Sequence, residues 1–269
     1  MKISEVKQYA KKDESATYYM ALHRKLGLYV AWMIVKIFPS ISANTVTIST
    51  LPLNILSATI LYFAIVSSSY SLLFVAFIIS FFTFTLDCSD GNIARIKKSA
   101  SIKGVYYDRL VHNLSHPLFY FVIGFGLYSS TDHIIYLIIF LVVGILSELS
   151  PLDVSQKDVE TLFIRQAVLH STINYNKQNH QFRESSHNQQ SASRPTSKVK
   201  KIIKTILEDD SFYLMLLLDL ILFNNQYYLS ISLALIVILG RVVIKLDIKK
   251  WESNLHEVLE KIDNHKSQL

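Results

Sequence analysis

The stretch LDCSDGNIARIKKSASIKGVYYDRLVHN, residues 86–113, joins the end of one apolar segment to the start of the next. It contains three acids, Asp87, Asp90 and Asp108, and His112 lies one residue before its end. The first two acids are three residues apart, and Asp108 and His112 are four apart, so each pair shares one face if the chain is helical there. Charged groups at the end of a membrane segment are costly and generally line a functional cavity. The stretch therefore predicts two membrane helices with a polar site where they meet.

The composition around this stretch is that of a membrane protein. Of the 269 residues, 51% are hydrophobic, and the mean hydropathy is +0.30, which excludes an ordinary soluble domain. With only seven glycines and five prolines, a strand-rich barrel with many turns is disfavoured, and long apolar runs favour helices. A single cysteine, Cys88, excludes an intramolecular disulfide framework. We therefore predict an all-α integral membrane protein.

Six apolar segments are predicted to be transmembrane helices. They are residues 45–66, 70–88, 105–128, 132–151, 211–224 and 227–246. The fifth is shorter than the usual ~20 residues, so it either begins inside the preceding polar segment or spans the bilayer only in part. Residues 22–39 are amphipathic and flanked by bases, which predicts a helix lying in the membrane interface, with a seventh span as the alternative.

The basic residues predict the orientation of these helices. The loops after the first, third and fifth spans contain no Lys or Arg, whereas both termini and the loops after the second and fourth spans are basic. The positive-inside rule then puts both termini and the polar site in the cytoplasm, with a bacterial inner membrane as the expected location. The net charge of +6 is accordingly interpreted as attraction to the membrane surface, and no nucleic-acid partner is expected.

Five regions follow from this reading. They are a cytoplasmic N-terminus with the interfacial helix (1–44), the first four spans with the polar site (45–152), a polar insertion (153–210), the last two spans (211–246) and a cytoplasmic tail (247–269). The insertion is rich in Ser, Asn, Gln and His and has no apolar period, so we predict that it is disordered. In the last two spans, Asp219 and Arg241 either pair or line a pocket, or Arg241 reaches the cytoplasmic interface.

The residue types of the opening stretch favour one kind of chemistry. Clustered carboxylates repel each other unless a cation neutralises them, and hard oxygen ligands suit Mg²⁺ or Mn²⁺. Gly91 has no side chain, so a ligand can approach the backbone beside the acids. Arg95 carries a planar fork of donors that suits a phosphate. Together these residues suggest a metal-bound diphosphate, although interfacial charges at helix ends would give the same spacing.

From Asp87 onward the chain follows the pattern D-x2-D-G-x2-A-R-x8-G-x3-D-x3-H. This pattern resembles the signature of the CDP-alcohol phosphatidyltransferase family, D-x2-D-G-x2-A-R-x8-G-x3-D-x3-D. Every fixed position agrees except the last, which is His112 here. The signature is long and specific, and its place between the second and third of six spans also fits the family. The resemblance covers roughly residues 20–245, without the polar insertion.

The resemblance implies a reaction and a metal site. Members of the family bind a CDP-linked alcohol, commonly CDP-diacylglycerol, with two divalent metals, and an acceptor hydroxyl displaces CMP. Asp87, Asp90 and Asp108 match the family's metal-binding acids, and His112, at the position of the fourth, is the remaining candidate ligand. The implied partners are membrane lipids, the CDP-alcohol donor, an acceptor alcohol of unknown identity and a second copy of the chain in a homodimer. Phospholipid biosynthesis is the implied setting.

The resemblance also implies a set of residues that contact the donor nucleotide and its phosphates. Gly91, Arg95 and Ser101 match such positions in the signature. Asn44 and Thr47, at the start of the first span, resemble a donor-contacting stretch of the family.

His112 departs from the family pattern, where the matching acid contacts metal and is the presumed base. A neutral imidazole can accept a proton and can ligate a metal, so we predict that His112 is the general base. The substitution removes one negative charge, and an altered or silent site and a purely structural histidine remain as alternatives. His116 lies one turn further on, where it either completes a zinc-binding spacing or is buried and hydrogen-bonded.

Two other classes of function compete with an enzyme. One is a family relative that binds a CDP-alcohol without turning it over. The other is a transporter with an acidic cation site, which is disfavoured because the acids lie at one membrane face and not at the midplane.

Overall fold

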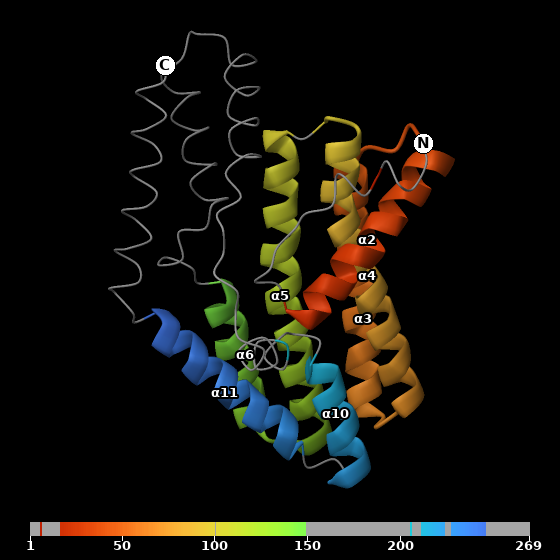
Figure 1. Ribbon diagram of the computed structural model, residues 1–269. Coiled ribbons are helices and arrows are strands. Elements are labelled where there is room, and N and C mark those ends of the chain that lie inside the picture. Colours follow the sequence, from red (N-terminus) through yellow and green to blue (C-terminus); the bar gives the residue numbers. More distant parts are fainter. Residues whose placement is uncertain are drawn as a thin grey trace.

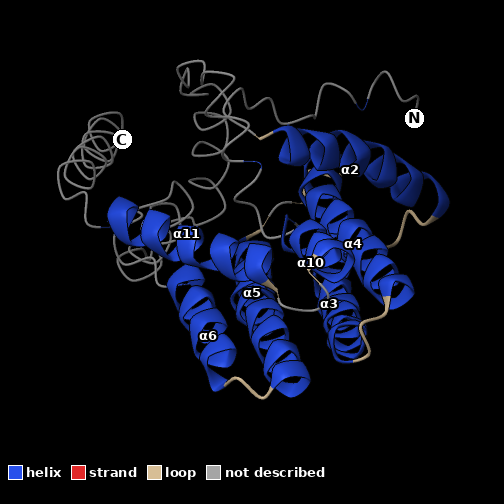
Figure 2. Cartoon of the chain, turned by 90° about the horizontal axis from the view of Figure 1, so that it is seen from below, coloured by secondary structure: helices blue, strands red, loops and turns tan. Residues whose placement is uncertain are grey.

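The computed structural model of the chain describes residues 6, 17–99, 101–148, 205, 211–223 and 227–245, and within these residues it contains seven helices and no strand (Figures 1 and 2). The helices are α2 (Tyr18–Ile37), α3 (Ala43–Val66), α4 (Tyr70–Ile96), α5 (Ile102–Thr131), α6 (Ile134–Glu148), α10 (Ser211–Leu222) and α11 (Tyr228–Lys245). The predicted all-helical class is confirmed. The insertion predicted for 153–210, except Thr205, and the tail predicted for 247–269 lie outside the described residues.

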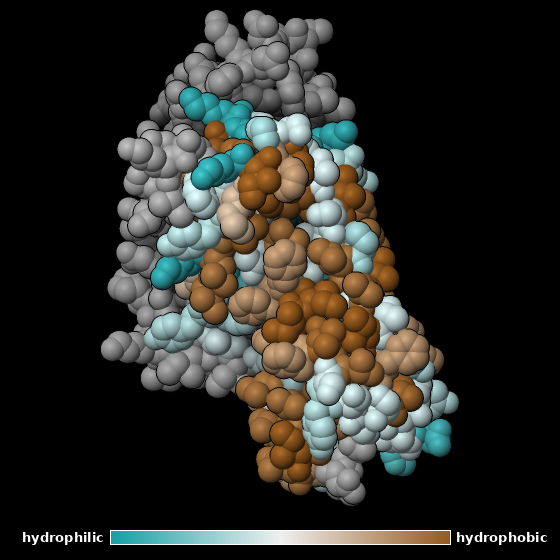
Figure 3. All heavy atoms as spheres, turned by 90° about the vertical axis from the view of Figure 1, so that its right-hand side faces the viewer, coloured by the Kyte–Doolittle hydropathy of each residue, from teal (hydrophilic) through white to brown (hydrophobic). Residues whose placement is uncertain are grey.

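Three of the described helices, α3, α4 and α5, are long and apolar enough to cross a membrane. The helices α6, α10 and α11 are apolar but shorter over their described side chains, so the count of six spans stays a prediction. Large apolar side chains are exposed on the outside of the bundle, and Figure 3 shows them as a broad hydrophobic surface between more polar ends. Such a surface suits contact with lipid, since a soluble protein rarely exposes so much contiguous apolar area.

The helices run further than the predicted spans at the polar site. Helix α4 continues to Ile96, past the predicted end at 88, and α5 begins at Ile102, before the predicted start at 105. Hydropathy marks where the chain leaves lipid, whereas a helix ends where its backbone is capped. Ser101 caps α5 by accepting a hydrogen bond from Gly104 N, a common helix start. Asp87 and Asp90 therefore lie on one continuous helix.

The bundle is built around α3, which packs against α4 and α5, while α6 packs on α5 and α2 crosses α4 (Figures 1 and 2). A core of buried apolar side chains joins α3, α4, α5, α6, α10 and α11. Its largest fully buried members are Tyr120, Tyr227, Phe140, Phe212, Leu61 and Ile65. This packing fixes the relation between α4 and α5, the two helices that carry the polar stretch.

His23 anchors α2 to α4 through a buried polar contact. Its ring is fully buried and lies 4.3–4.6 Å from the ring centroids of Tyr19, Phe81 and Phe84. The Thr85 hydroxyl donates to Phe81 O (2.9 Å), so His23 Nδ1, 2.8 Å from Thr85 Oγ1, must be the donor in that contact. Burial lowers the pKa of His23 to about 4, which keeps the imidazole neutral.

Gly27 allows α2 to approach α4 closely beside the polar stretch. A Cβ at this position would lie 2.9 Å from Cys88 Cβ and 3.1 Å from Ser89 N. At Gly144, by contrast, an added Cβ would lie 3.4 Å from Tyr120 Cβ, which is ordinary contact. The two glycines therefore differ in whether the neighbouring backbone has room for a methyl group.

We expect Gly27→Ala to lower the melting temperature of the purified protein in detergent, with a loss of ~1–3 kcal/mol typical of overpacking. Gly144→Ala is the control and should leave the melting temperature unchanged or raise it, because alanine favours helix over glycine. Equal melting temperatures for the two variants would show that α2 does not depend on the close approach at Gly27.

Asp219 has a structural role that its spacing did not predict. Its fully buried carboxylate accepts hydrogen bonds from Leu229 N (2.8 Å), Ser230 N (2.8 Å) and Ser230 Oγ (2.6 Å) at the start of α11. A carboxylate at a helix N-terminus satisfies free N–H groups and is favoured by the helix dipole. Asp219 thus joins α10 to α11. The side chain of Arg241, for which pairing with Asp219 was one alternative, lies outside the described side chains.

Candidate active site

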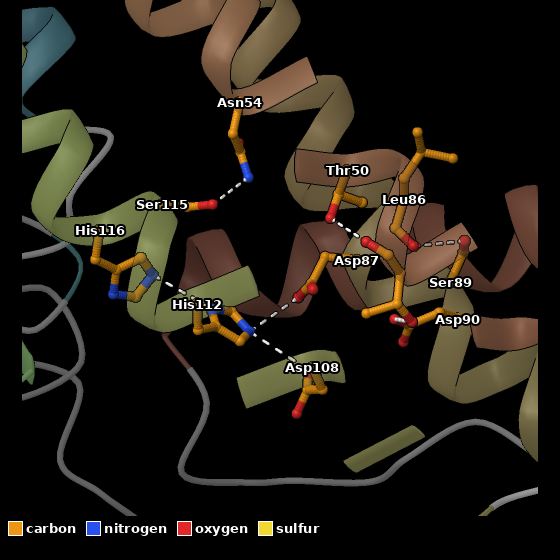
Figure 4. Close-up of polar contacts among 11 residues, drawn as sticks. Thr50, Asn54, Leu86, Asp87, Ser89, Asp90, Asp108, His112, Ser115 and His116 are labelled. Carbon is orange, nitrogen blue, oxygen red and sulfur yellow. Dashed lines mark hydrogen bonds and ion pairs between the residues drawn. The ribbon is translucent and has the colours of Figure 1, made fainter. Parts of the chain in front are cut away.

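The polar stretch brings two acids and a histidine together where α4 meets α5. Asp87 from α4 and Asp108 and His112 from α5 each offer a ligand atom, and these atoms lie within 4.8 Å of one another. His112 Nε2 is 3.6 Å from Asp87 Oδ2 and 3.5 Å from Asp108 Oδ1 (Figure 4). All three side chains are partly buried, with 18–34% exposed. We call these three residues the acid–histidine group, and its oxygen and nitrogen donors suit a divalent cation.

Asp90 lies one turn beyond Asp87 on α4 but is not a member of the acid–histidine group. Its carboxylate accepts a hydrogen bond from the buried Thr47 hydroxyl of α3, with 2.5 Å between Oγ1 and Oδ2. The two predicted site residues Asp90 and Thr47 are therefore in contact. Of the four predicted metal ligands, the structure brings three together. The fourth, Asp90, is turned toward α3.

His112 also contacts His116, one turn along α5. The distance between His112 Nδ1 and His116 Nε2 is 3.3 Å (Figure 4), so one nitrogen donates and the other accepts. When His112 Nδ1 carries the hydrogen, Nε2 presents a lone pair to the two carboxylates, as a ligand or a proton acceptor requires. When His116 donates, His112 Nε2–H faces the carboxylates instead. His116 thereby sets which tautomer of His112 faces the acids.

Gly91 and Arg95 follow the acids on α4. The Arg95 guanidinium reaches back along the helix, and its Nη2 donates to Asn92 Oδ1 (2.7 Å). A Cβ at Gly91 would lie 3.5 Å from Arg95 Nη1, which is the nearest heavy atom apart from the adjacent residues and the nearby backbone of α4. The guanidinium therefore lies over the bare backbone of Gly91, in an arrangement that offers planar donors to a phosphate beside the acids.

Asn44 and Ser101, the remaining predicted contacts of the nucleotide, lie near the starts of α3 and α5. A Cβ at Gly104 would be 3.0 Å from Asn44 Oδ1, so these two helix starts approach each other. Ser101 is exposed and caps α5, so its hydroxyl has a hydrogen-bond partner even when no ligand is bound. Nearby, Lys97 Nζ donates to the carbonyls of Pro39 (2.6 Å) and Ile41 (2.5 Å) and so ties the end of α4 to the loop before α3.

A cavity of about 370 Å³, which the sequence did not predict, lies beside the acid–histidine group. Asp87, His112 and His116 line it, and it continues between α2, α3, α4, α5 and α10. A signal was present in α3, where Thr50, Asn54 and Ser57 are four and three residues apart and so share one face of an otherwise apolar helix.

An all-helical bundle with apolar spans and an acid–histidine group at a helix junction defines an integral membrane protein with a candidate metal site. The family model for CDP-alcohol phosphatidyltransferase matches residues 40–244, and the chain belongs to that family. It is therefore a transferase family member whose relatives act on CDP-alcohols and use divalent metals. Comparison with curated proteins gave no match.

Proposed function

We propose that the protein transfers a phosphatidyl or other phospho-alcohol group from a CDP-linked donor to an acceptor hydroxyl, with release of CMP, in phospholipid biosynthesis. The observation that carries the proposal is the convergence of Asp87, Asp108 and His112 within 4.8 Å, in a chain of this family. The donor we favour is CDP-diacylglycerol, because the apolar outer surface suits a substrate that remains in the bilayer.

The acids are proposed to hold the divalent metals, Mg²⁺ or Mn²⁺, in a two-metal site. Asp87 and Asp108 contribute oxygens from α4 and α5, and Asp90 is the third acid. His112 Nε2 lies within 3.6 Å of both carboxylates and is a nitrogen ligand only in the alternative in which it is not the base. Bound divalent ions would neutralise the donor's diphosphate and stabilise charge on the departing phosphate. The oxygen-rich donor set fits this class of ion.

His112 is proposed to be the general base. An oxygen of the acceptor hydroxyl bonds to the β-phosphorus of the donor, and the bond from that phosphorus to the CMP oxygen breaks, so CMP leaves with the electron pair. The hydroxyl proton passes to the imidazole of His112. His116 stabilises the required tautomer by accepting from His112 Nδ1 across their 3.3 Å contact.

Gly91 and Arg95 are proposed to contact the donor's diphosphate, where the guanidinium lies over bare backbone. Asn44, Thr47 and Ser101 are proposed to contact the nucleotide. These residues come from the starts of α3 and α5, at the same end of the bundle as the acids. The basic loops at this end support a cytoplasmic site, and a homodimer is the assembly we propose from the family resemblance.

The direct test is CMP release from CDP-diacylglycerol by the purified full chain, with Mg²⁺ or Mn²⁺ and a panel of acceptor alcohols. We expect release that depends on the metal and is lost in Asp90→Asn, which keeps the size of the side chain and removes its charge. Donor binding with no CMP release for any acceptor would instead support a silent CDP-alcohol-binding protein. A chain that neither binds the donor nor releases CMP would contradict the proposed function.

A further inference from the structure

Hydroxyl and amide side chains line the cavity beside the acid–histidine group, from α4 as well as from α3 and α5. Those of α3 and α5 are Thr50, Asn54, Ser57 and Ser115, and we call these four residues the polar wall. Asn54 Nδ2 donates to Ser115 Oγ (2.9 Å), which bridges α3 and α5 (Figure 4). The Asn54 carbonyl oxygen has no further hydrogen bond among the described residues, so it can accept one from a ligand.

Aromatic side chains also line the cavity. They include Tyr19 of α2, Phe84 of α4 and Phe119 of α5, and we call these three residues the aromatic wall. A small-molecule pocket is commonly lined by aromatic groups with a few placed polar groups, and the volume of about 370 Å³ lies at the lower end of the usual range of roughly 300–1,000 Å³. The cavity therefore suits a small molecule that carries both hydroxyl and C–H groups.

The charge around the cavity is the informative feature. Among the described residues that line it, none is Lys or Arg, and the only formal charge is the Asp87 carboxylate at one end. A phosphate buried without a cation would be strongly disfavoured. The reacting hydroxyl must reach the acid–histidine group, so a phosphate on the same molecule would lie farther in, along the uncharged polar wall.

We propose that this cavity binds the acceptor as a small, uncharged polyhydroxy alcohol with no phosphate of its own. This inference rests on the proposed function and specifies its acceptor. One hydroxyl lies at His112 and is the group that reacts. The other hydroxyls bond to Asn54, Ser115 and neighbouring members of the polar wall, and the C–H face lies against the aromatic wall.

The test compares matched acceptors with the full chain in nanodiscs that contain CDP-diacylglycerol and Mn²⁺. The pairs are glycerol with glycerol 3-phosphate and myo-inositol with its monophosphate, and the readout is kcat/KM for the labelled lipid product. We expect at least one neutral polyol to exceed its monophosphate by about tenfold or more, because the polyol leaves no buried charge unpaired. A faster monophosphate in both pairs would overturn the inference, as would donor binding with no reaction of either polyol.

Donor binding is measured separately, by the rise in melting temperature on adding CDP-diacylglycerol with Mn²⁺. A chain that neither binds donor nor releases CMP would contradict the proposed function and, with it, this inference. A chain that binds donor and prefers monophosphates would contradict only the inference. The two failures are thus distinguishable.

Asn54→Leu tests the polar wall at nearly constant side-chain volume. We expect it to raise KM for the preferred polyol by about tenfold, the effect of losing a hydrogen bond to a hydroxyl, with donor binding retained. Thr59→Val, on the lipid-exposed side of the same helix, should change neither the KM for the polyol nor donor binding. If Asn54→Leu does not fold, Ser115→Ala removes the partner hydroxyl with a smaller change. An unchanged KM in a folded wall variant would contradict the proposed contact.

Discussion

Asp108→Asn is expected to lower metal-dependent CMP release by roughly 10³-fold, because a bound cation supplies several kcal/mol of charge stabilisation and each ~1.4 kcal/mol is a factor of ten. The change keeps the shape of the side chain but replaces one carboxylate oxygen of the acid–histidine group with an amide nitrogen. Asp108 Oδ1 lies 3.5 Å from His112 Nε2, so the variant also removes a negative charge beside the imidazole that gains the proton.

The measurement has two parts, Mn²⁺ binding followed by electron paramagnetic resonance and CMP release under saturating donor. Asp132→Asn is the matched control, since Asp132 is exposed beyond the end of α5, where its left-handed backbone also suits asparagine. Both measured quantities should fall in Asp108→Asn and stay unchanged in the control. Full Mn²⁺ binding in Asp108→Asn would show that this acid is not a ligand.

His112→Ala is expected to reduce kcat by about 10²–10⁴-fold, the usual contribution of a general base, while Mn²⁺ binding stays within about tenfold of the wild type. This separation follows if the carboxylates of Asp87 and Asp108 hold the ion and the imidazole moves the proton. Loss of Mn²⁺ binding in the same variant would instead make His112 chiefly a ligand, and equal kcat values would make it a structural residue.

His112→Asp distinguishes a base from a packing residue. Aspartate can accept a proton, and its reference pKa is ~3.9 against ~6.5 for histidine. We therefore expect this variant to recover activity relative to His112→Ala, with the acidic limb of its pH–rate profile at lower pH than in the wild type. Identical profiles for His112→Asp and the wild type would contradict the base role. His133→Asp, at an exposed site between α5 and α6, controls for the change in charge.

The acid–histidine group could be predicted because its residues are close to one another in the sequence. A spacing of four on one helix aligns Asp108 with His112, and the end of the preceding helix, α4, brings Asp87 into range of both. The direction of Asp90 could not be predicted in this way. Three residues on a helix leave two side chains about 60° apart around the axis, and the hydrogen bond from Thr47 of α3 holds the Asp90 side chain toward that helix.

The cavity and the role of Asp219 depend on contacts that no single segment specifies. The polar residues of α3 form a visible stripe in the sequence, but Phe119 and Tyr19 complete the cavity from other helices. The predicted end of the second span at 88 was wrong for the helix, since α4 continues to Ile96. Hydropathy reports the environment of a segment, and helix length also depends on caps and packing.

The contact between Asp219 and the start of α11 has a consequence for how the chain is made. A charged side chain inside a membrane segment is costly, and α10, which we predict to enter the bilayer, has only 12 residues to offset Asp219. The backbone N–H groups that satisfy this carboxylate belong to Leu229 and Ser230, which emerge from the ribosome after α10 does. We therefore expect α10 to wait at the insertion machinery until α11 emerges, so that the two helices enter the bilayer as a hairpin.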